Sequence, residues 1–174
     1  MSSESAGRPA RKLSSEQFRQ ACGRFATGVA IASVMDSQGA PHGLTVSSFT
    51  SVSLDPPLIL ICVGHKVTSI DIFRKASHFA INILAEDQRE IATRFARKGQ
   101  DRFDGLEWRL GESGAPLLAG VLAEIECALR RQVPAGDHDI LIGEMLSMRV
   151  HRGEPLAYYA GRYRRLAPGA KNAG

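Results

Sequence analysis

Strand-like runs follow one another along this chain of 174 residues with almost no helix between them, and this order constrains the fold most. Seven short strands are expected, at 29–35, 44–53, 57–63, 78–84, 121–133, 139–150 and 156–165. Strands joined without helical crossovers pair antiparallel, so the pattern favours a mainly β domain, an antiparallel Greek-key barrel or sandwich, over a doubly wound sheet. No G-x-G-x-x-G follows a strand, so a Rossmann nucleotide site is not supported.

The first of two or three expected helices has a clear start signal. Ser14 is expected as its N-cap, with Gln17 completing a capping box and with Leu13 and Phe18 at the hydrophobic-staple positions. The apolar stripe of this helix would consist of Phe18, Cys22 and Phe25.

Two further helices are predicted downstream. A short one over 68–76 would be capped by Thr68. A longer amphipathic one over 86–98 would turn Ile91 and Phe95 inward and stop at Gly99. In the last long strand, Gly143 is expected to mark a β-bulge.

The net charge of +4 is concentrated near the two ends of the chain. Residues 1–12 contain three Lys/Arg and one Glu, and residues 162–174 contain four Lys/Arg and no acid. The part between them is therefore slightly acidic. This distribution argues against a nucleic-acid-binding face on the folded body.

Length and composition indicate one domain, expected over 13–166. The segments 1–12 and 167–174 are rich in Ser, Gly, Ala and Pro and are predicted to be disordered tails.

No apolar run approaches a membrane span, and the first residues lack the apolar core of a signal peptide. The three cysteines are scattered, which fits a reducing cytoplasm, and neither they nor the histidines have metal-ligand spacing, so no metal is expected.

The stretch HGLTVSSFTSVSLDPP, residues 42–57, combines strand-forming residues with many small hydroxyls and has no acidic or lysine/arginine charge before Asp55. Short hydroxyl side chains let a flat ligand approach the backbone and offer hydrogen bonds without charges that must be desolvated. This pattern suits a flavin or dinucleotide. The alternative is a solvent-facing strand of an ordinary barrel.

Several segments together resemble the short-chain flavin reductases, the reductase components of two-component flavin-dependent monooxygenases. They are FATGVAIAS at 25–33, GLTVSSFTSVSLDPPLILICV at 43–63, FAINIL at 79–84, RFARKGQDRFDG at 94–105 and PAGDHDILIGEM at 134–145. The resemblance covers roughly residues 14–166. The last two segments look especially like reductases of actinomycete aromatic-polyketide oxygenation, which favour FMN.

The resemblance implies an FMN-binding split β-barrel that works as a homodimer, with flavin near the subunit interface. It implies electron transfer from NADH, sometimes NADPH, to FMN or FAD. Reduced flavin would then reach a separate monooxygenase. Hydride transfer between two cofactors needs no strong acid or base from the protein, which agrees with the absence of a catalytic carboxylate pair or nucleophile triad in the sequence.

By the family pattern, the flavin ring would be lined by Thr45, Val46, Ser47, Ser48, Phe49, Ser51, Val52 and Ser53. Lys66, Thr68 and Ser69 would hold the flavin phosphate, because a lysine before a helix start adds charge to free N–H groups. The plain alternative is a surface lysine beside an ordinary N-cap.

Other candidate cofactor contacts come from separate parts of the chain: Thr27, Gly28, Val29, Asn82, Arg102, Phe103, Tyr158, Arg162 and Tyr163. Gly28 could equally be a helix stop, and Asn82 could bond the backbone instead of flavin. Arg102 and Phe103 could be a charged loop with an apolar anchor. The three residues near the end could simply form the closing strand.

Gly136, Asp137 and His138 match the G-D-H signature that the family associates with the nicotinamide nucleotide. His138 is the expected catalytic residue, because an imidazole can stack on nicotinamide and can carry charge opposite anionic reduced flavin. Asp137 would orient that ring or shape the turn.

Two other functions compete with an NAD(P)H:flavin oxidoreductase. One is a flavin-binding split barrel without reductase activity, or a flavin-dependent oxidase, and the G-D-H segment argues against it. The other is a small basic interaction module, which the uncharged hydroxyl-rich strand and the acidic body disfavour.

Overall fold

The computed structural model describes residues 13–99 and 102–167, and within them the chain is mainly β. The helices are α1 (Ser15–Cys22), α2 (Ile70–Lys75) and α3 (Arg89–Ala96). The strands are β1 (Thr27–Gly28), β2 (Ala30–Met35), β3 (Pro41–Val46), β4 (Thr50–Leu54), β5 (Pro57–Gly64), β6 (His78–Ile83), β7 (Trp108–Leu110), β8 (Pro116–Leu118), β9 (Ala123–Ala135), β10 (His138–Val150), β11 (Ala157–Tyr159) and β12 (Arg162–Arg164). The predicted tails lie outside the described residues, apart from Ala167.

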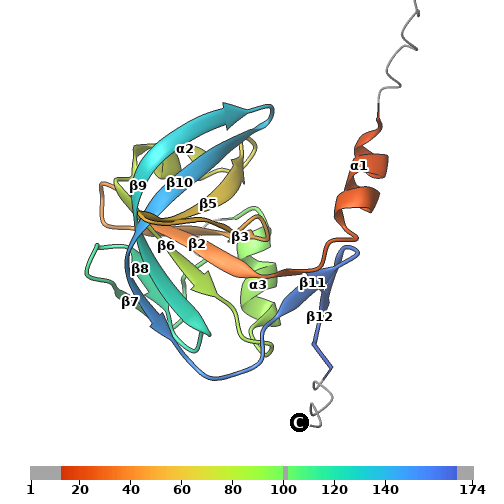
Figure 1. Cartoon of the computed structure of the whole chain (residues 1–174). Helices are drawn as coiled ribbons and strands as arrows, with labels where there is room; N and C mark the ends of the chain where they lie inside the picture. Colours follow the sequence, from red (N-terminus) through yellow and green to blue (C-terminus); the bar gives the residue numbers. More distant parts are fainter. Residues whose placement is uncertain (1–12, 100–101, 168–174) are drawn as a thin grey trace, which may run out of the picture.

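The main sheet has seven antiparallel strands in the order β3-β2-β6-β9-β10-β5-β4 (Figure 1). Its edge strands, β3 and β4, are consecutive in the chain, so the sheet curls until its edges meet at residues 47–49. There the Ser48 hydroxyl accepts a hydrogen bond from the Cys62 backbone N–H at 2.9 Å and lies 3.3 Å from the Cys62 carbonyl oxygen. This side chain takes the place of ladder hydrogen bonds at the meeting point of the two edges.

Two predicted strands are each divided in the structure. The strand expected over 44–53 is wrong as a single element, because residues 47–49 form the corner where the chain leaves β2 as partner and joins β5. The strand expected over 156–165 is the hairpin β11–β12. Its turn has left-handed backbone at Ala160 and Gly161, with φ of 49° and 77°.

The capping box that begins α1 is confirmed, and the apolar residues predicted to form its stripe are exposed. The Ser14 hydroxyl accepts from the Gln17 N–H at 3.1 Å, and the Ser14 N–H donates to the Gln17 side chain at 3.0 Å. No α1 residue is buried, and Phe18 and Phe25 are 62% and 78% exposed. Figure 1 shows α1 standing away from the barrel. The helix is capped at its C-terminus by Gly23, so Gly28 is not its stop.

The other two helices are shorter than predicted. The N-cap position of α2 is Ser69 rather than Thr68, and the Ser69 side chain makes no capping hydrogen bond. α3 ends at Ala96, before the expected stop at Gly99. Its predicted inward face is confirmed at Phe95, which is buried, while Ile91 is only partly buried.

Two apolar clusters hold the domain together. One fills the barrel around Phe73, Phe79 and Ile81, and the other lies under α3 around Phe95 and Phe103. α3 comes close to β3 because position 43 is glycine: a Cβ there would lie 2.7 Å from the Phe95 ring. This close approach brings the residues after α3 next to the β2–β3 turn.

The hairpin β7–β8, which sequence patterning missed, covers the outer face of β9. Glu124 and Glu126 alternate with Ile125 and Cys127 along β9, and both glutamates are buried beneath this hairpin. Glu126 accepts from the Ser113 N–H at 2.7 Å and from the Ser147 hydroxyl at 3.0 Å. Burial alone would raise the pKa of Glu126, but these hydrogen bonds outweigh it and lower the pKa.

The bulge predicted at Gly143 is confirmed by a shift in the β9–β10 register between Ile142 and Gly143.

None of the helices in the described part of the chain is long and apolar enough to cross a membrane.

Candidate functional site

A cleft of about 810 Å³ lies between the start of α2, the β2–β3 turn and the segment that follows α3. Thr68 and Ser69 line it from one side, and Arg102 and Phe103 line it from the other. These two pairs are far apart in the sequence and were predicted separately. The fold brings them to one cavity.

Two buried polar atoms at this cleft have no hydrogen-bond partner among the described residues: the Ser69 Oγ and the Arg102 Nε. Ser69 is 6% exposed. The other Arg102 nitrogens donate to the carbonyl oxygens of Gly43 and Arg97 and to no carboxylate. Burial lowers the pKa of the Arg102 guanidinium, because a charge removed from water is less well solvated. Each of these groups is a donor of the kind that an anion accepts from.

The opposite wall carries the ion pair between His42 and Asp36, whose Nε2 and Oδ2 atoms are 2.8 Å apart. The Ala40 N–H and the His42 ring lower the pKa of the Asp36 carboxyl. The Asp36 carboxylate is therefore already hydrogen-bonded by the backbone of the turn and by His42. Arg102 supplies positive charge on the other side of the cleft.

The loop 64–69, which leads from β5 into α2, is tied to β10 by a network that the sequence did not reveal. Asp139 is buried, and its two carboxylate oxygens accept from the His65 ring at 2.9 Å and from the Arg74 Nε at 2.6 Å. Arg74 is the first and His65 the second cause of the lowered Asp139 pKa. The loop that carries Lys66, Thr68 and Ser69 is thus fixed through three residues to which sequence reasoning gave no role.

His138 lies at the other end of the same loop, directly opposite Gly64 in the β5–β10 ladder. Its side chain is half exposed, and its Nδ1 is 2.7 Å from the Asp137 carboxylate. That hydrogen bond lowers the pKa of Asp137. A Cβ at position 64 would lie 3.3 Å from the His138 Nε2, so glycine leaves room for the imidazole. Asp137 is thus hydrogen-bonded to the His138 ring, the contact that one of its two predicted roles requires.

The hydroxyl-rich stretch supplies both internal ties and exposed groups. Thr45 donates to the Ala92 carbonyl in α3 at 2.7 Å, and Ser48 bonds Cys62. Val46 is buried in the barrel core. Ser47, Ser51 and Val52 are exposed, whereas Phe49 and Ser53 are partly buried.

The remaining candidates lie elsewhere. Asn82 is fully buried; its amide donates to the Ser33 hydroxyl at 2.9 Å and accepts from the Leu118 N–H at 2.8 Å, so the backbone-bonding alternative holds. Thr27 and Gly28 pair with β11, next to the buried Val29. Tyr158, Arg162 and Tyr163 belong to the hairpin β11–β12 and do not line the cleft.

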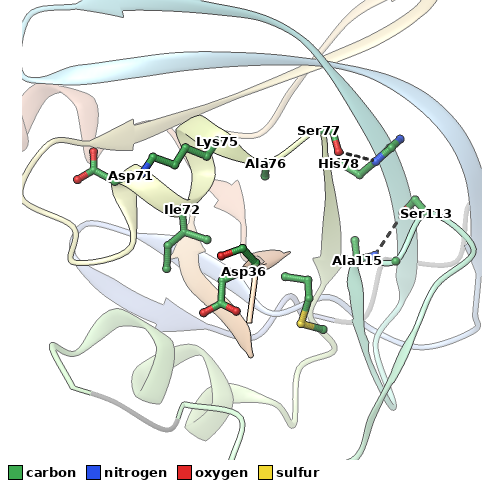
Figure 2. Close-up of a pocket in the computed structure, with 12 residues that line it drawn as sticks. Asp36, Asp71, Ile72, Lys75, Ala76, Ser77, His78, Ser113 and Ala115 are labelled. Carbon is green, nitrogen blue, oxygen red and sulfur yellow. Dashed lines mark hydrogen bonds between the residues drawn. The ribbon is translucent and has the colours of Figure 1, made fainter. Parts of the chain in front are cut away.

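A second cavity of about 460 Å³ is separate from the predicted residues. It lies between the end of β2, α2, the start of β6 and the β7–β8 turn, and Figure 2 shows Asp36, Lys75 and His78 around it. None of the predicted contact residues lines it. The described residues contain no cluster of three or more His, Cys, Asp or Glu that could hold a metal ion.

The fold is a mainly β, antiparallel split barrel, and its cleft contains two buried polar groups without a partner among the described residues. The chain belongs to the flavin reductase like domain family, whose model matches residues 22–167. This confirms the resemblance found in the sequence and the fold that it implied.

Relatives agree with this assignment. The chain is 42% identical over 146 residues to a probable flavin reductase of Rhizobium meliloti, covering 84% of this chain and 47% of the relative, so it spans about half of that protein. It is 36% identical to HsaB, the reductase subunit of a flavin-dependent monooxygenase of Rhodococcus jostii, covering 91% and 82%.

Among solved structures, the NADH:FAD oxidoreductase of Streptomyces globisporus C-1027, in complex with NAD and FAD fragments, matches with a TM-score of 0.85. It is 42% identical, and the match covers 90% of this chain and 94% of that one.

The group that this family implies is a flavin, and the residues at the cleft fit it. A flavin phosphate needs hydrogen-bond donors and positive charge, and the orphaned Ser69 Oγ and Arg102 Nε are buried donors in the lining of this cleft.

Proposed function

We propose that this protein is an NAD(P)H:flavin oxidoreductase that reduces FMN or FAD and supplies the reduced flavin to a separate monooxygenase. The observation that carries the proposal is the cleft in which Ser69 and Arg102 present unpartnered buried groups. In a chain of the flavin reductase family, this cavity is suited to the flavin phosphate.

The flavin and NADH supply the hydride chemistry, so the chain's residues need only bind and orient them. Thr68 joins Ser69 and Arg102 at the phosphate end of the cleft. Ser47, Ser51 and Val52 are exposed and offer contacts for the ring. His138, held by Asp137, is positioned for the nicotinamide nucleotide, and NADH is the expected donor.

A homodimer is the proposed working form. Phe18 and Phe25 are largely exposed although α1 is amphipathic, and α1 is tied to the barrel side only at its end, where the Ala160 N–H donates to the Gly23 carbonyl at 2.9 Å. Such apolar groups favour burial against another surface, and a second copy would provide it. Light scattering coupled to size exclusion tests this: a monomer at micromolar concentration would rule the dimer out.

We place the protein in the cytoplasm on chemical grounds. Cys22, Cys62 and Cys127 are all free, which fits a reducing compartment. No metal, nucleic acid or membrane is part of the proposed function.

The direct test is steady-state oxidation of NADH and NADPH with added FMN, FAD or no flavin. Oxidation that requires added flavin and saturates with it supports the reductase. Flavin binding without oxidation of either nucleotide would instead indicate a flavin-binding barrel that lacks reductase activity. In His138→Ala, the KM for NADH should rise and kcat should fall; unchanged values would remove His138 from the mechanism.

A further inference from the structure

Five cations surround a groove of about 600 Å³ along the outer face of α3. Its charged lining consists of Arg89, Arg94, Arg97, Lys98 and Arg102, with Glu90 as the one acid among its described residues. Counting charge along the sequence placed the basic character near the chain ends and missed this cluster. Arg89 and Arg94 are exposed on α3, whereas Arg97, Lys98 and Arg102 follow the end of the helix at Ala96.

Ordinary structural roles account for part of this cluster. Arg89 lies over the Tyr163 ring, with 6.0 Å from its Cζ to the ring centroid, and Arg94 donates to the Asp104 carbonyl at 2.7 Å. Arg97 and Lys98 follow the last turn of α3, where positive side chains complement the helix dipole. None of the five forms an ion pair with a carboxylate among the described residues. The groove therefore keeps a large excess of positive charge.

The groove is continuous with the flavin cleft, because Gly99 and Arg102 line both cavities. Arg102 is thus the boundary between them. A flavin phosphate held by Ser69 and Arg102 lies at the entrance to the groove. FMN ends at that phosphate, whereas FAD continues with a second phosphate and an adenosine.

We propose that the α3 groove binds the second phosphate and the adenosine of FAD, so that the protein prefers FAD to FMN. This inference rests on the proposed function and names its flavin. Arg97 and Lys98 are the groups assigned to the second phosphate, since both side chains are exposed and neither has a hydrogen-bond partner within the described chain. The adenosine diphosphate end of NADH has the same chemistry, but His138 lies with loop 64–69 and does not line the groove.

The test compares flavin binding to the full chain and to the double variant Arg97→Gln/Lys98→Gln. The matched control is Arg131→Gln/Arg149→Gln, which removes the same charge from exposed positions on β9 and β10. Flavin-fluorescence titration gives the Kd for FAD and for FMN without any turnover. We expect the Kd for FAD to rise about tenfold in the groove variant, since charge-assisted contacts to phosphate are lost. The Kd for FMN should stay within about twofold, and the control should match wild type.

Two further arms separate the possible sources of the phosphate. ADP should displace FAD from wild type and compete less well in the groove variant, and the KM values for NADH and NADPH should not change. Equal loss of FAD and FMN affinity, or none, would overturn the inference. A selective rise in the KM for NADH or NADPH would assign the groove to the nicotinamide nucleotide and also overturn it. If wild type binds FMN and FAD with equal Kd values and reduces both, this inference is refuted and the proposed function stands. If wild type binds neither flavin, both are refuted.

Discussion

Replacing Ser69 with alanine should lower flavin affinity without lowering the stability of the flavin-free protein. Ser69 occupies the N-cap position of α2, where Ser→Ala normally costs about 1 kcal/mol. Here the hydroxyl makes no capping hydrogen bond, and its Oγ is buried without a partner. Its removal therefore breaks no bond in the flavin-free protein.

The magnitudes follow from these contacts. A hydrogen bond to a charged group contributes about 1.5–3 kcal/mol, so losing one to the flavin phosphate should raise the Kd roughly 10- to 150-fold. A buried hydroxyl without a partner is unfavourable, so the free energy of unfolding should stay equal or rise by up to about 1 kcal/mol. The two effects have opposite signs, which an ordinary structural serine would not give.

The assay is flavin-fluorescence titration together with urea unfolding of flavin-free protein, for Ser69→Ala and for Ser33→Ala. Ser33 is also buried, but its hydroxyl donates to the Pro116 carbonyl at 2.6 Å and accepts from Asn82. Ser33→Ala should therefore lose about 1–3 kcal/mol of stability while its flavin Kd stays near wild type. If Ser69→Ala loses about 1 kcal/mol or more and binds flavin normally, the hydroxyl is a helix cap and the reasoning fails.

Three other substitutions test the framework around the site. Glu126→Gln should lower the free energy of unfolding by about 2 kcal/mol at neutral pH, because an amide cannot accept all the hydrogen bonds that the carboxylate accepts. The folded-state pKa of Glu126 is lowered, so the stability that its carboxylate contributes is present above the unfolded pKa of about 4.3 and is lost as pH falls through the folded pKa. The urea midpoint should therefore decline less steeply between pH 7 and pH 3 in the variant than in wild type. Asp139→Asn should raise the KM for flavin several-fold with little change in kcat, since it loosens loop 64–69 through His65 and Arg74, and equal falls in kcat and kcat/KM would contradict this. Gly143→Ala should cost about 1–3 kcal/mol in thermal unfolding, because its Cβ would lie 2.5 Å from the Phe79 ring, and an unchanged Tm would show that the bulge can relax.

Sequence patterns predicted those strands and helix starts that carry a clear local signal. The strands expected at 121–133 and 139–150 correspond to the long hairpin β9–β10, and the capping box located the start of α1. The patterns did not predict the division of 44–53, because the corner at 47–49 contains neither Gly nor Pro and is flanked by strand-forming residues. They also gave no position for α1, since an apolar stripe indicates that a partner surface exists but not which surface it is.

The site was predicted in part, and the limit was distance along the chain. Motifs identified Ser69 and Arg102 separately, and the cleft joins them. Asp139 gave no signal, because its partners His65 and Arg74 are more than sixty residues away and no local pattern connects them. The α3 groove was hidden for the opposite reason: its charges are close together, but acids elsewhere in the chain cancel them in any count over the whole body.

The hydroxyls of this chain show how a structural role and a ligand role can be told apart. Three of them, on Ser33, Thr45 and Ser48, each have a backbone partner in a distant element, and together they hold β8, α3 and β5 in place. In sequence, Thr45 and Ser48 looked as suited to flavin as Ser69. Ser69 differs because its hydroxyl is buried at the cleft with no partner, and a polar group in that state is costly until something else bonds it. The hydroxyl that the folded chain leaves unpartnered at the cleft is therefore a stronger indicator of the ligand than the number of hydroxyls in the stretch 42–57.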